Sequence, residues 1–238
     1  MTYRIHPEVL QRADDLVVYL VVANQLTNSE SDEHDAHLLE QAEHAFAAAY
    51  GETEIRSLPA VAAYRRLFEV FGINPNRFAP SIEAMLKRIA KGGHLHLINQ
   101  MVDRSNTVSI RTNVSLGAHD AADLLQDMAL RLSVAGDRFL PLGSDTWEEM
   151  PPGELVFASG SEIQTRRGMW RQSEKGKSDL STTKVYFHLV GFQAMEENLR
   201  QAVVQIEDLI QELGGTGQTY RLDASTPVVS WHAAPDLD

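Results

Sequence analysis

The hydrophobic pattern changes character along the chain. Residues 16–22 form a continuous, β-branched apolar run, which is typical of a central strand covered on both faces. After this run, apolar side chains recur at helical spacing in residues 38–49, 57–71 and 81–90, and glycine follows each segment within a few positions. We expect three helices there, with Ser57 and Ser81 as the N-caps of the second and third.

Beyond residue 130 the chain breaks into short strand-like runs separated by turns. The clearest runs are residues 138–140, 153–157 and 184–190. Residues 195–213 then form a helix with an unbroken apolar stripe, which we expect to pack on the chain's own sheet; a monomer and a homodimer both remain open. Because helices precede strands without regular βαβ alternation, the pattern predicts an α+β fold, with a helix-rich first half and a mainly antiparallel or mixed sheet in the second.

The chain length and composition fit one cytoplasmic domain. A length of 238 residues suits a single domain, expected over residues 1–224, followed by a frayed tail over residues 225–238. The sequence contains no cysteine, which excludes disulfides, thiolate metal sites and a cysteine nucleophile, and fits a reducing compartment. The first residues lack the apolar stretch of a secretory signal. The longest apolar run is far shorter than the about 20 residues of a bilayer span, so we expect no membrane partner.

The charge distribution contains one local exception. A net charge of −12 argues against general coating of nucleic acid, so no DNA partner is expected. Between residues 164 and 184, however, six basic side chains stand against two acidic ones, with an aromatic ring and an amide among them. Such a loop is suited to binding a phosphate backbone at one defined position, although a solvated hairpin tip has the same composition. The candidate RNA-binding residues are Arg166, Arg167, Trp170, Arg171, Lys175 and Lys177.

A stripe of acidic and imidazole side chains offers a different chemistry. Glu33, His37, Glu40 and His44 share one face of the first expected helix, an arrangement that could hold a divalent metal in a hydrolase. The opposite face of this helix is the apolar one, so the stripe also fits an ordinary solvated surface. We prefer the solvated face, and expect no metal and no cofactor.

A polar cluster in the middle of the chain is suited to positioning water. Asp103, Ser105 and Asn106 fall in a segment whose apolar side chains have helical spacing, and His119 and Asp120 follow what reads as a glycine turn at Gly117. Hydroxyl, amide, imidazole and carboxylate groups at short range can orient a hydrolytic water. Polar residues on a helix are also the usual helix surface, so spacing alone leaves both interpretations open.

These segments resemble a known family. Residues 98–106 and 117–120 are similar to the Asn-Pro-Val-Val-Asp-x-Thr-Asn and His-Ala-Phe-Asp segments of the B3/B4 editing domain, which belongs to the β subunit of bacterial phenylalanyl-tRNA synthetase. Residues 80–86, 152–156 and 182–185 resemble phrases of freestanding members, in the same order. The likeness runs from about residue 58 to residue 192.

The resemblance implies a B3/B4-like fold that hydrolyses the ester joining a wrong amino acid to the 3′ end of tRNA. The family's Thr, Asn and His would correspond to Ser105, Asn106 and His119, which are the expected catalytic residues. Asp103, Asp120 and His188 are the expected substrate-binding residues, and tRNA is the expected partner. No catalytic domain of a synthetase is present, so aminoacylation is not expected.

The sequence departs from the family at three places, one of which is a slightly longer spacing from Ser105 to His119. The glutamate that recognises the mischarged side chain would fall at about His188, and the Ala-Gly-x-Met-Gly-Gly phrase has no counterpart in residues 175–181. A non-catalytic module that binds tRNA or a nucleotide-like ligand is therefore the main alternative. The amino acid and tRNA that the chain handles are not predicted.

Overall fold

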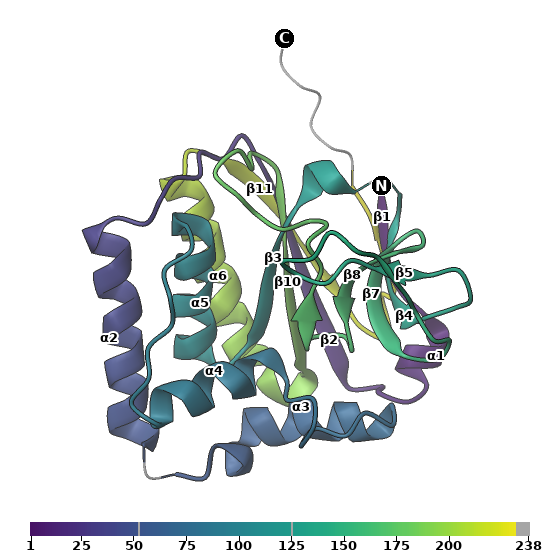
Figure 1. The fold of residues 1–238 in the computed structure, drawn as a ribbon, viewed down its shortest axis with the longest axis horizontal. Helices are drawn as coiled ribbons and strands as arrows, with labels where there is room; N and C mark the ends of the chain where they lie inside the picture. The colour runs from purple at the N-terminus through teal and green to yellow at the C-terminus, as the bar shows by residue number, and fades with distance from the viewer. Residues whose placement is uncertain (52, 125, 232–238) are drawn as a thin grey trace.

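The molecule is built from a group of helices and two β-sheets that stand side by side (Figure 1). The structure, a computed structural model, describes residues 1–51, 53–124 and 126–231. Its α-helices are α1 (Pro7–Leu10), α2 (Glu33–Tyr50), α3 (Pro59–Val70), α4 (Ser81–Ala90), α5 (Gln100–Thr112) and α6 (Glu196–Glu212). Its strands are β1 (Thr2–Ile5), β2 (Leu16–Asn24), β3 (Ser115–Asp120), β4 (Met128–Leu132), β5 (Arg138–Phe139), β6 (Glu148–Glu149), β7 (Leu155–Ser159), β8 (Glu162–Arg166), β9 (Arg171–Gln172), β10 (Val185–Phe192), β11 (Thr216–Leu222) and β12 (Val228–Ser230).

The four-stranded sheet forms the centre of the molecule. Its order is β11-β2-β10-β3, and every neighbouring pair is antiparallel. Strand β2 is buried along almost its whole length, as its continuous apolar sequence predicts. Helix α6 packs on β2, β10 and β11, α5 packs beside it against β3, and α2 lies against α5.

The second sheet is mixed. Its main path is β12-β1-β4-β7-β8-β5-β6, with β9 paired to β8, and the β1–β4 and β5–β8 pairs are parallel. Aromatic side chains from this sheet meet the four-stranded sheet on the face away from α6. Tyr3 of β1 and Phe157 of β7 lie within ring-contact distance of Tyr186 and His188 of β10 or of each other. The candidate site lies at this junction.

The architecture confirms the predicted α+β class, the buried strand and the packing of α6 on the chain's own sheet. The two N-cap predictions are wrong. Ser57 lies in a short 3₁₀ turn and Leu58 precedes α3, which begins with Pro59. Pro80 is the N-cap of α4, so Ser81 is its first helical residue. Proline pre-sets its own φ and pushes the preceding residue out of the α region, which explains the start of α3.

Two expected irregular segments are strands. Gly117 was expected in a turn but lies inside β3, where it pairs with His188. Residues 228–230 form β12 against β1, so the expectation of a frayed tail is wrong for them, and residues 232–238 lie outside the described residues. Within the described ranges, every helix is too short or too polar to cross a bilayer.

Candidate active site

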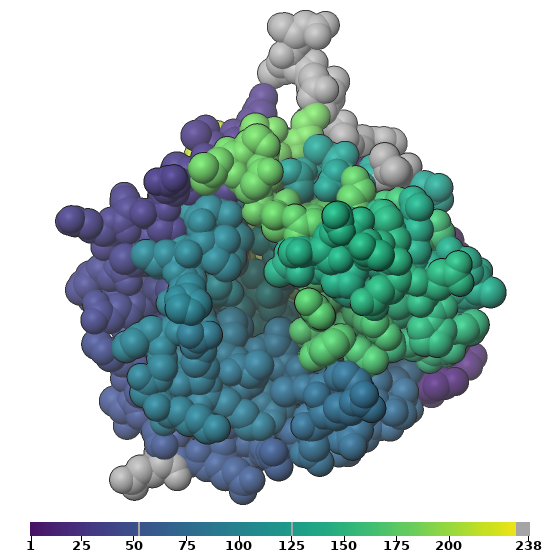
Figure 2. All heavy atoms as spheres, in the orientation of Figure 1, coloured from purple at the N-terminus to yellow at the C-terminus, as the bar shows by residue number. Residues whose placement is uncertain are grey.

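A small polar pocket opens beside the junction of the two sheets. Figure 2 shows the surface hollowed between the helical part, in blue and teal, and the strands and loops of the second half, in green. The pocket has a volume of about 90 Å³ and takes its walls from β3, β10, the start of α4 and the loop between β8 and β9. Its lining includes Ser115, His119, Trp170, Arg171, Gln172 and His188.

The pairing of β3 with β10 brings two histidines together. The register places His119 opposite Tyr186 and Gly117 opposite His188, and because side chains alternate between faces, all four positions share one face. The His119 ring stacks on Tyr186 at 4.8 Å between ring centroids, and the His188 ring stacks on Phe157 at 4.3 Å. Both imidazoles are only 2–4% exposed.

Burial keeps both imidazoles neutral. Desolvation lowers the pKa of His119 to about 3. Desolvation, with a smaller contribution from the nearby His119 ring, also lowers the pKa of His188 to about 3. The Tyr3 hydroxyl lies 2.7 Å from His188 Nε2. Burial raises the pKa of Tyr3 well above its ordinary value, so this hydroxyl stays protonated. At neutral pH the pocket therefore offers uncharged hydrogen-bonding groups.

His119 occupies the space above Gly117. A Cβ atom at position 117 would lie 2.9 Å from His119 Nε2, a distance that side chains do not adopt, so glycine is required for this ring position. His119 lies two residues further along the same face of β3, and its imidazole covers the position of Gly117. Its expected catalytic role stays a prediction.

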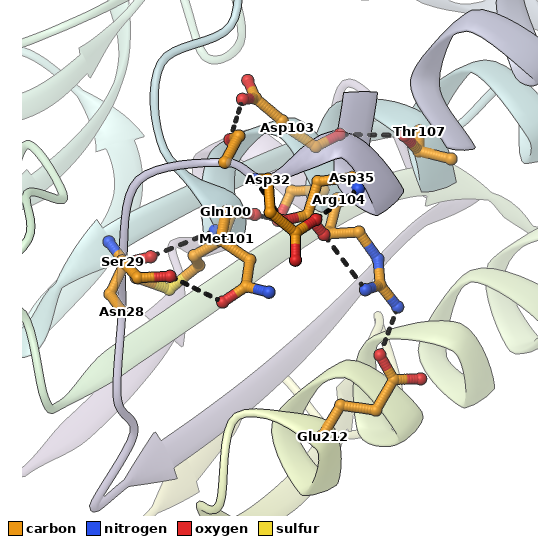
Figure 3. A network of polar contacts seen from close by, with 12 residues as sticks. Asn28, Ser29, Asp32, Asp35, Gln100, Met101, Asp103, Arg104, Thr107 and Glu212 are labelled. Carbon is orange, nitrogen blue, oxygen red and sulfur yellow. Dashed lines mark hydrogen bonds and ion pairs between the residues drawn. The ribbon is translucent and has the colours of Figure 1, made fainter. Parts of the chain in front are cut away.

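The polar residues at the start of α5 are bound by groups from neighbouring parts of the chain (Figure 3). Asp103 is fully buried, and its carboxylate accepts hydrogen bonds from the Ile98 amide at 3.0 Å and from the Ser31 hydroxyl at 2.5 Å. Arg104 pairs with Asp35 and Glu212, which joins α5 to α2 and α6. These contacts hold the entry to α5 in place.

The other expected residues of the polar cluster also make structural contacts or lie apart from the pocket. The Ser105 hydroxyl donates to the Met101 carbonyl of its own helix at 2.7 Å, and neither Ser105 nor Asn106 lines the pocket. Asp120 accepts from the Ala122 amide and from the Thr182 hydroxyl, at 2.7 and 2.6 Å. Of the expected catalytic and substrate-binding residues, the structure brings His119 and His188 together in the pocket.

Most cations of the basic loop are paired with carboxylates. Arg166 binds Glu154 at 2.7 Å and Glu148 at 3.1 Å, and Arg167 binds Glu154 at 3.1 Å. Lys175 pairs with Asp123 and Lys177 with Glu174. Arg171 is exposed, and its guanidinium makes no ion pair or hydrogen bond with the residues that the structure describes. It is therefore the basic side chain of this loop that can bind a phosphate without first losing a partner.

Trp170, at the pocket wall, is part of a cation–π cluster with Arg167 and Phe78. The Arg167 guanidinium lies 3.7 Å from the centroid of Phe78 and 4.5 Å from that of Trp170. Phe78 and Trp170 meet edge to face at 5.0 Å. Arg167 adopts a left-handed backbone conformation (φ 52°), and the turn it makes with Gly168 sets Trp170 against the pocket. Arg167 thus supports the indole ring.

The acidic and imidazole stripe of α2 does not form a metal site. Within the described ranges, no three His, Asp or Glu side chains come close enough together to hold a metal ion. His37 exchanges a hydrogen bond with Gln41, and His44 contacts Glu40 at 4.0 Å. The geometry favours the solvated-face interpretation over the metal-dependent hydrolase.

Three residues of the site region carried no sequence signal. Tyr3 lies in a segment to which no element was assigned from the sequence, Phe157 reads as an ordinary strand position, and Ser115 precedes a segment that was expected to turn. Their neighbours in space come from strands far away in the sequence, so only the sheet register reveals them.

Comparison with known proteins defines the class of the chain. The model of the B3/4 domain family matches residues 63–211, more than half of the chain, and the chain belongs to this family. The match begins near the expected start of the family-like core and continues past residue 192 into α6.

One solved structure adds context. An N-terminal fragment of the phenylalanyl-tRNA synthetase β-subunit from Pyrococcus horikoshii is similar with a TM-score of 0.44 and 11% sequence identity. The similarity covers 93% of this chain and 53% of that one, so the chain spans about half the length of the fragment. No curated protein matches.

Proposed function

We propose that the chain is a trans-acting aminoacyl-tRNA deacylase, which hydrolyses the ester of a mischarged tRNA in the pocket of His119 and His188. The observation that carries the proposal is that these neutral histidines lie on the same face of adjacent strands in a B3/4 domain. They line a pocket whose wall also carries Trp170 and Arg171. The proposed partner is the aminoacylated 3′ end of tRNA.

The chemistry of the pocket fits this substrate. An ester needs a water molecule, hydrogen-bond donors for the developing oxyanion, and a surface for the terminal nucleotide. The histidines and Gln172 supply uncharged hydrogen-bonding groups, the indole of Trp170 offers a face for stacking, and Arg171 has a free guanidinium for a phosphate. No metal is required for these roles.

A non-catalytic module that binds the same ligand is the second candidate. Two observations favour it: Ser105 and Asn106 lie outside the pocket, and a pKa of about 3 makes each buried imidazole a weak base. Such a module would bind aminoacyl-tRNA and leave the ester intact.

Hydrolysis of a panel of purified aminoacyl-tRNAs, correctly and wrongly charged, separates the two candidates. We expect faster loss of one or two wrongly charged species with the wild-type chain, and loss of that effect in His119→Ala. His34→Ala, which removes an exposed imidazole at the start of α2, is the matched control. Ser105→Ala should retain hydrolysis. A flat panel combined with tight tRNA binding would establish the binding module instead.

A further inference from the structure

The two ring nitrogens of His119 have different surroundings. Nδ1 lies 3.3 Å from the amide nitrogen of Gln172. Nε2 has no hydrogen-bond partner within the described part of the chain, and it lies over Gly117, which itself lines the pocket. The protein therefore binds one nitrogen and leaves the other for a ligand.

The contacts of Gln172 identify which nitrogen carries the proton. Gln172 Nε2 is also 3.2 Å from the Ala118 carbonyl oxygen and 3.3 Å from that of Gly176, and carbonyl oxygens can only accept. The amide nitrogen of Gln172, and not its oxygen, must therefore face these two carbonyls and His119 Nδ1, and it donates the hydrogen bonds. The Ala118 carbonyl also accepts from Ser178, and the Gly176 carbonyl accepts from the Asp120 amide, so the two carbonyls do not need both N–H groups of Gln172. One N–H of Gln172 is therefore available for His119 Nδ1. A neutral ring that accepts at Nδ1 carries its proton on Nε2.

His188 is fixed by an analogous contact. The Tyr3 hydroxyl is fully buried, and His188 Nε2 is its hydrogen-bond partner among the described residues. A buried O–H group without an acceptor is costly, so Tyr3 donates and His188 accepts at Nε2. Its proton then lies on Nδ1. Each ring keeps one N–H that has no acceptor among the described residues.

We infer that His119 acts as a hydrogen-bond donor, holding the acyl oxygen of the ester through Nε2–H, and that Gln172 is the positioning residue that fixes this tautomer. The inference rests on the proposed function and adds the role of each group. It assigns His119 to charge stabilisation, in place of water activation as a base.

The reaction balances without a change in the protonation of His119. When the water oxygen bonds to the acyl carbon, the carbonyl π pair moves onto the oxygen held by Nε2–H. That pair returns as the bond to the ribose oxygen breaks. The water gives up one proton and the ribose oxygen takes one up, so His119 keeps its own throughout.

The tautomer can be measured in the free protein, without tRNA. In the full chain labelled with ¹⁵N-histidine, the ring nitrogen shifts of His119 should show an unprotonated Nδ1 and a protonated Nε2 from pH 5 to pH 8. Gln172→Met should abolish this preference. Gln164→Met is the matched control, because Gln164 lies in adjoining strand β8 and its buried amide has no partner in the described residues. A protonated Nδ1 in the wild type, or titration of the ring within this pH range, would overturn the inference.

Kinetics test the same role independently. His119→Ala should lower deacylation by ~10²- to 10³-fold, the usual effect of removing one oxyanion donor. His119→Gln should restore activity to within about tenfold of the wild type, since an amide keeps an N–H donor but cannot act as a base. Equal loss in both variants would contradict the donor role. Absence of wild-type hydrolysis would instead refute the proposed function, whereas a wrong tautomer overturns this inference even when hydrolysis is strong.

Discussion

The start of α5 and the end of β3 both carry polar side chains next to a buried core, but these groups are used in opposite ways. At α5, Asp103 and Arg104 are bound by neighbouring protein groups, and their contacts fasten three helices (Figure 3). At β3, His119 has one ring nitrogen facing the protein and one facing a pocket. A polar group whose hydrogen-bonding capacity is fully used by the protein holds the fold, and one with spare capacity at a pocket is available for a ligand.

The same distinction applies within the basic loop. Arg166 and Arg167 neutralise Glu154, whereas Arg171 has no such partner in the described residues. Composition alone treats all three as equal cations. The arrangement of carboxylates decides which of them can bind a phosphate, because a paired arginine must first lose its partner.

Among the variants that leave both histidines in place, the largest effect is expected from Gly117→Ala, which changes the pocket without removing any polar group. The added methyl group would meet His119 Nε2 and displace the imidazole. We expect deacylation to fall by about 10²-fold, as for the loss of one oxyanion donor, while the melting temperature changes little. Initial hydrolysis rates and thermal unfolding of the variant check this. Full activity would show that the position of His119 over Gly117 is not needed.

Asp103→Ala should have the opposite profile. It removes the buried acceptor of the Ile98 amide and of the Ser31 hydroxyl, so the free energy of unfolding should fall by about 2 kcal/mol. Activity per folded molecule should be nearly unchanged. Urea unfolding measures the loss, with Asp14→Ala on an exposed carboxylate as the control. A selective loss of activity at full stability would instead place Asp103 in the site.

Acid should destabilise the pocket, whereas Asp103 of the α5 network responds to pH in the opposite direction. His119 and His188 have folded pKa values of about 3, below the ordinary 6.5, so their contribution to stability is full above pH 6.5 and is lost as pH falls toward 3. Each histidine should remove about 1.4 kcal/mol per pH unit below 6.5. Burial raises the pKa of Asp103, so its contribution has the opposite sign: it is present at low pH and is lost as pH rises.

Urea unfolding between pH 7.5 and pH 5 measures this slope. In His188→Gln the slope should fall by about half, since one of the two buried imidazoles is gone. An unchanged slope would mean that His188 is not held neutral by burial.

Arg171→Ala should have the smallest effect and should appear only in binding. We expect weaker tRNA affinity by several fold and a salt dependence reduced by about one charge, with unchanged stability. Arg166→Ala should instead lower stability through the loss of its contacts with Glu154 and Glu148, and leave the salt dependence intact. Titrations at several salt concentrations separate the two. A larger salt effect for Arg166 would reverse the assignment.

The parts of the fold with strong periodicity could be predicted from the sequence. Strand β2 has a continuous β-branched run and α6 an unbroken apolar stripe, so local pattern and tertiary burial agree in both. Strand β3 was missed because Gly117 and its polar neighbours have little intrinsic preference for a strand. The segment becomes a strand through its pairing with β10, which the local sequence does not encode.

The site was predictable only in part. His119 and His188 were named from the resemblance, and they do meet. The amide of Gln172 was noted, but its contact with His119 depends on the turn between β8 and β9. The acidic partners of Arg166 come from β6 and from the residue before β7, and Tyr3 lies far from His188 in the sequence, so neither could be deduced from spacing.

The hydrogen bond between Tyr3 and His188 joins positions 185 residues apart, and β2 pairs with β10 over a comparable separation. Closing such large loops is entropically costly and makes folding slow relative to helix formation. The helices can form early from local contacts, but the pocket cannot exist until these distant strands have met. In a refolding experiment, recovery of ligand binding should therefore lag behind recovery of helical signal, and binding would report the completion of the fold.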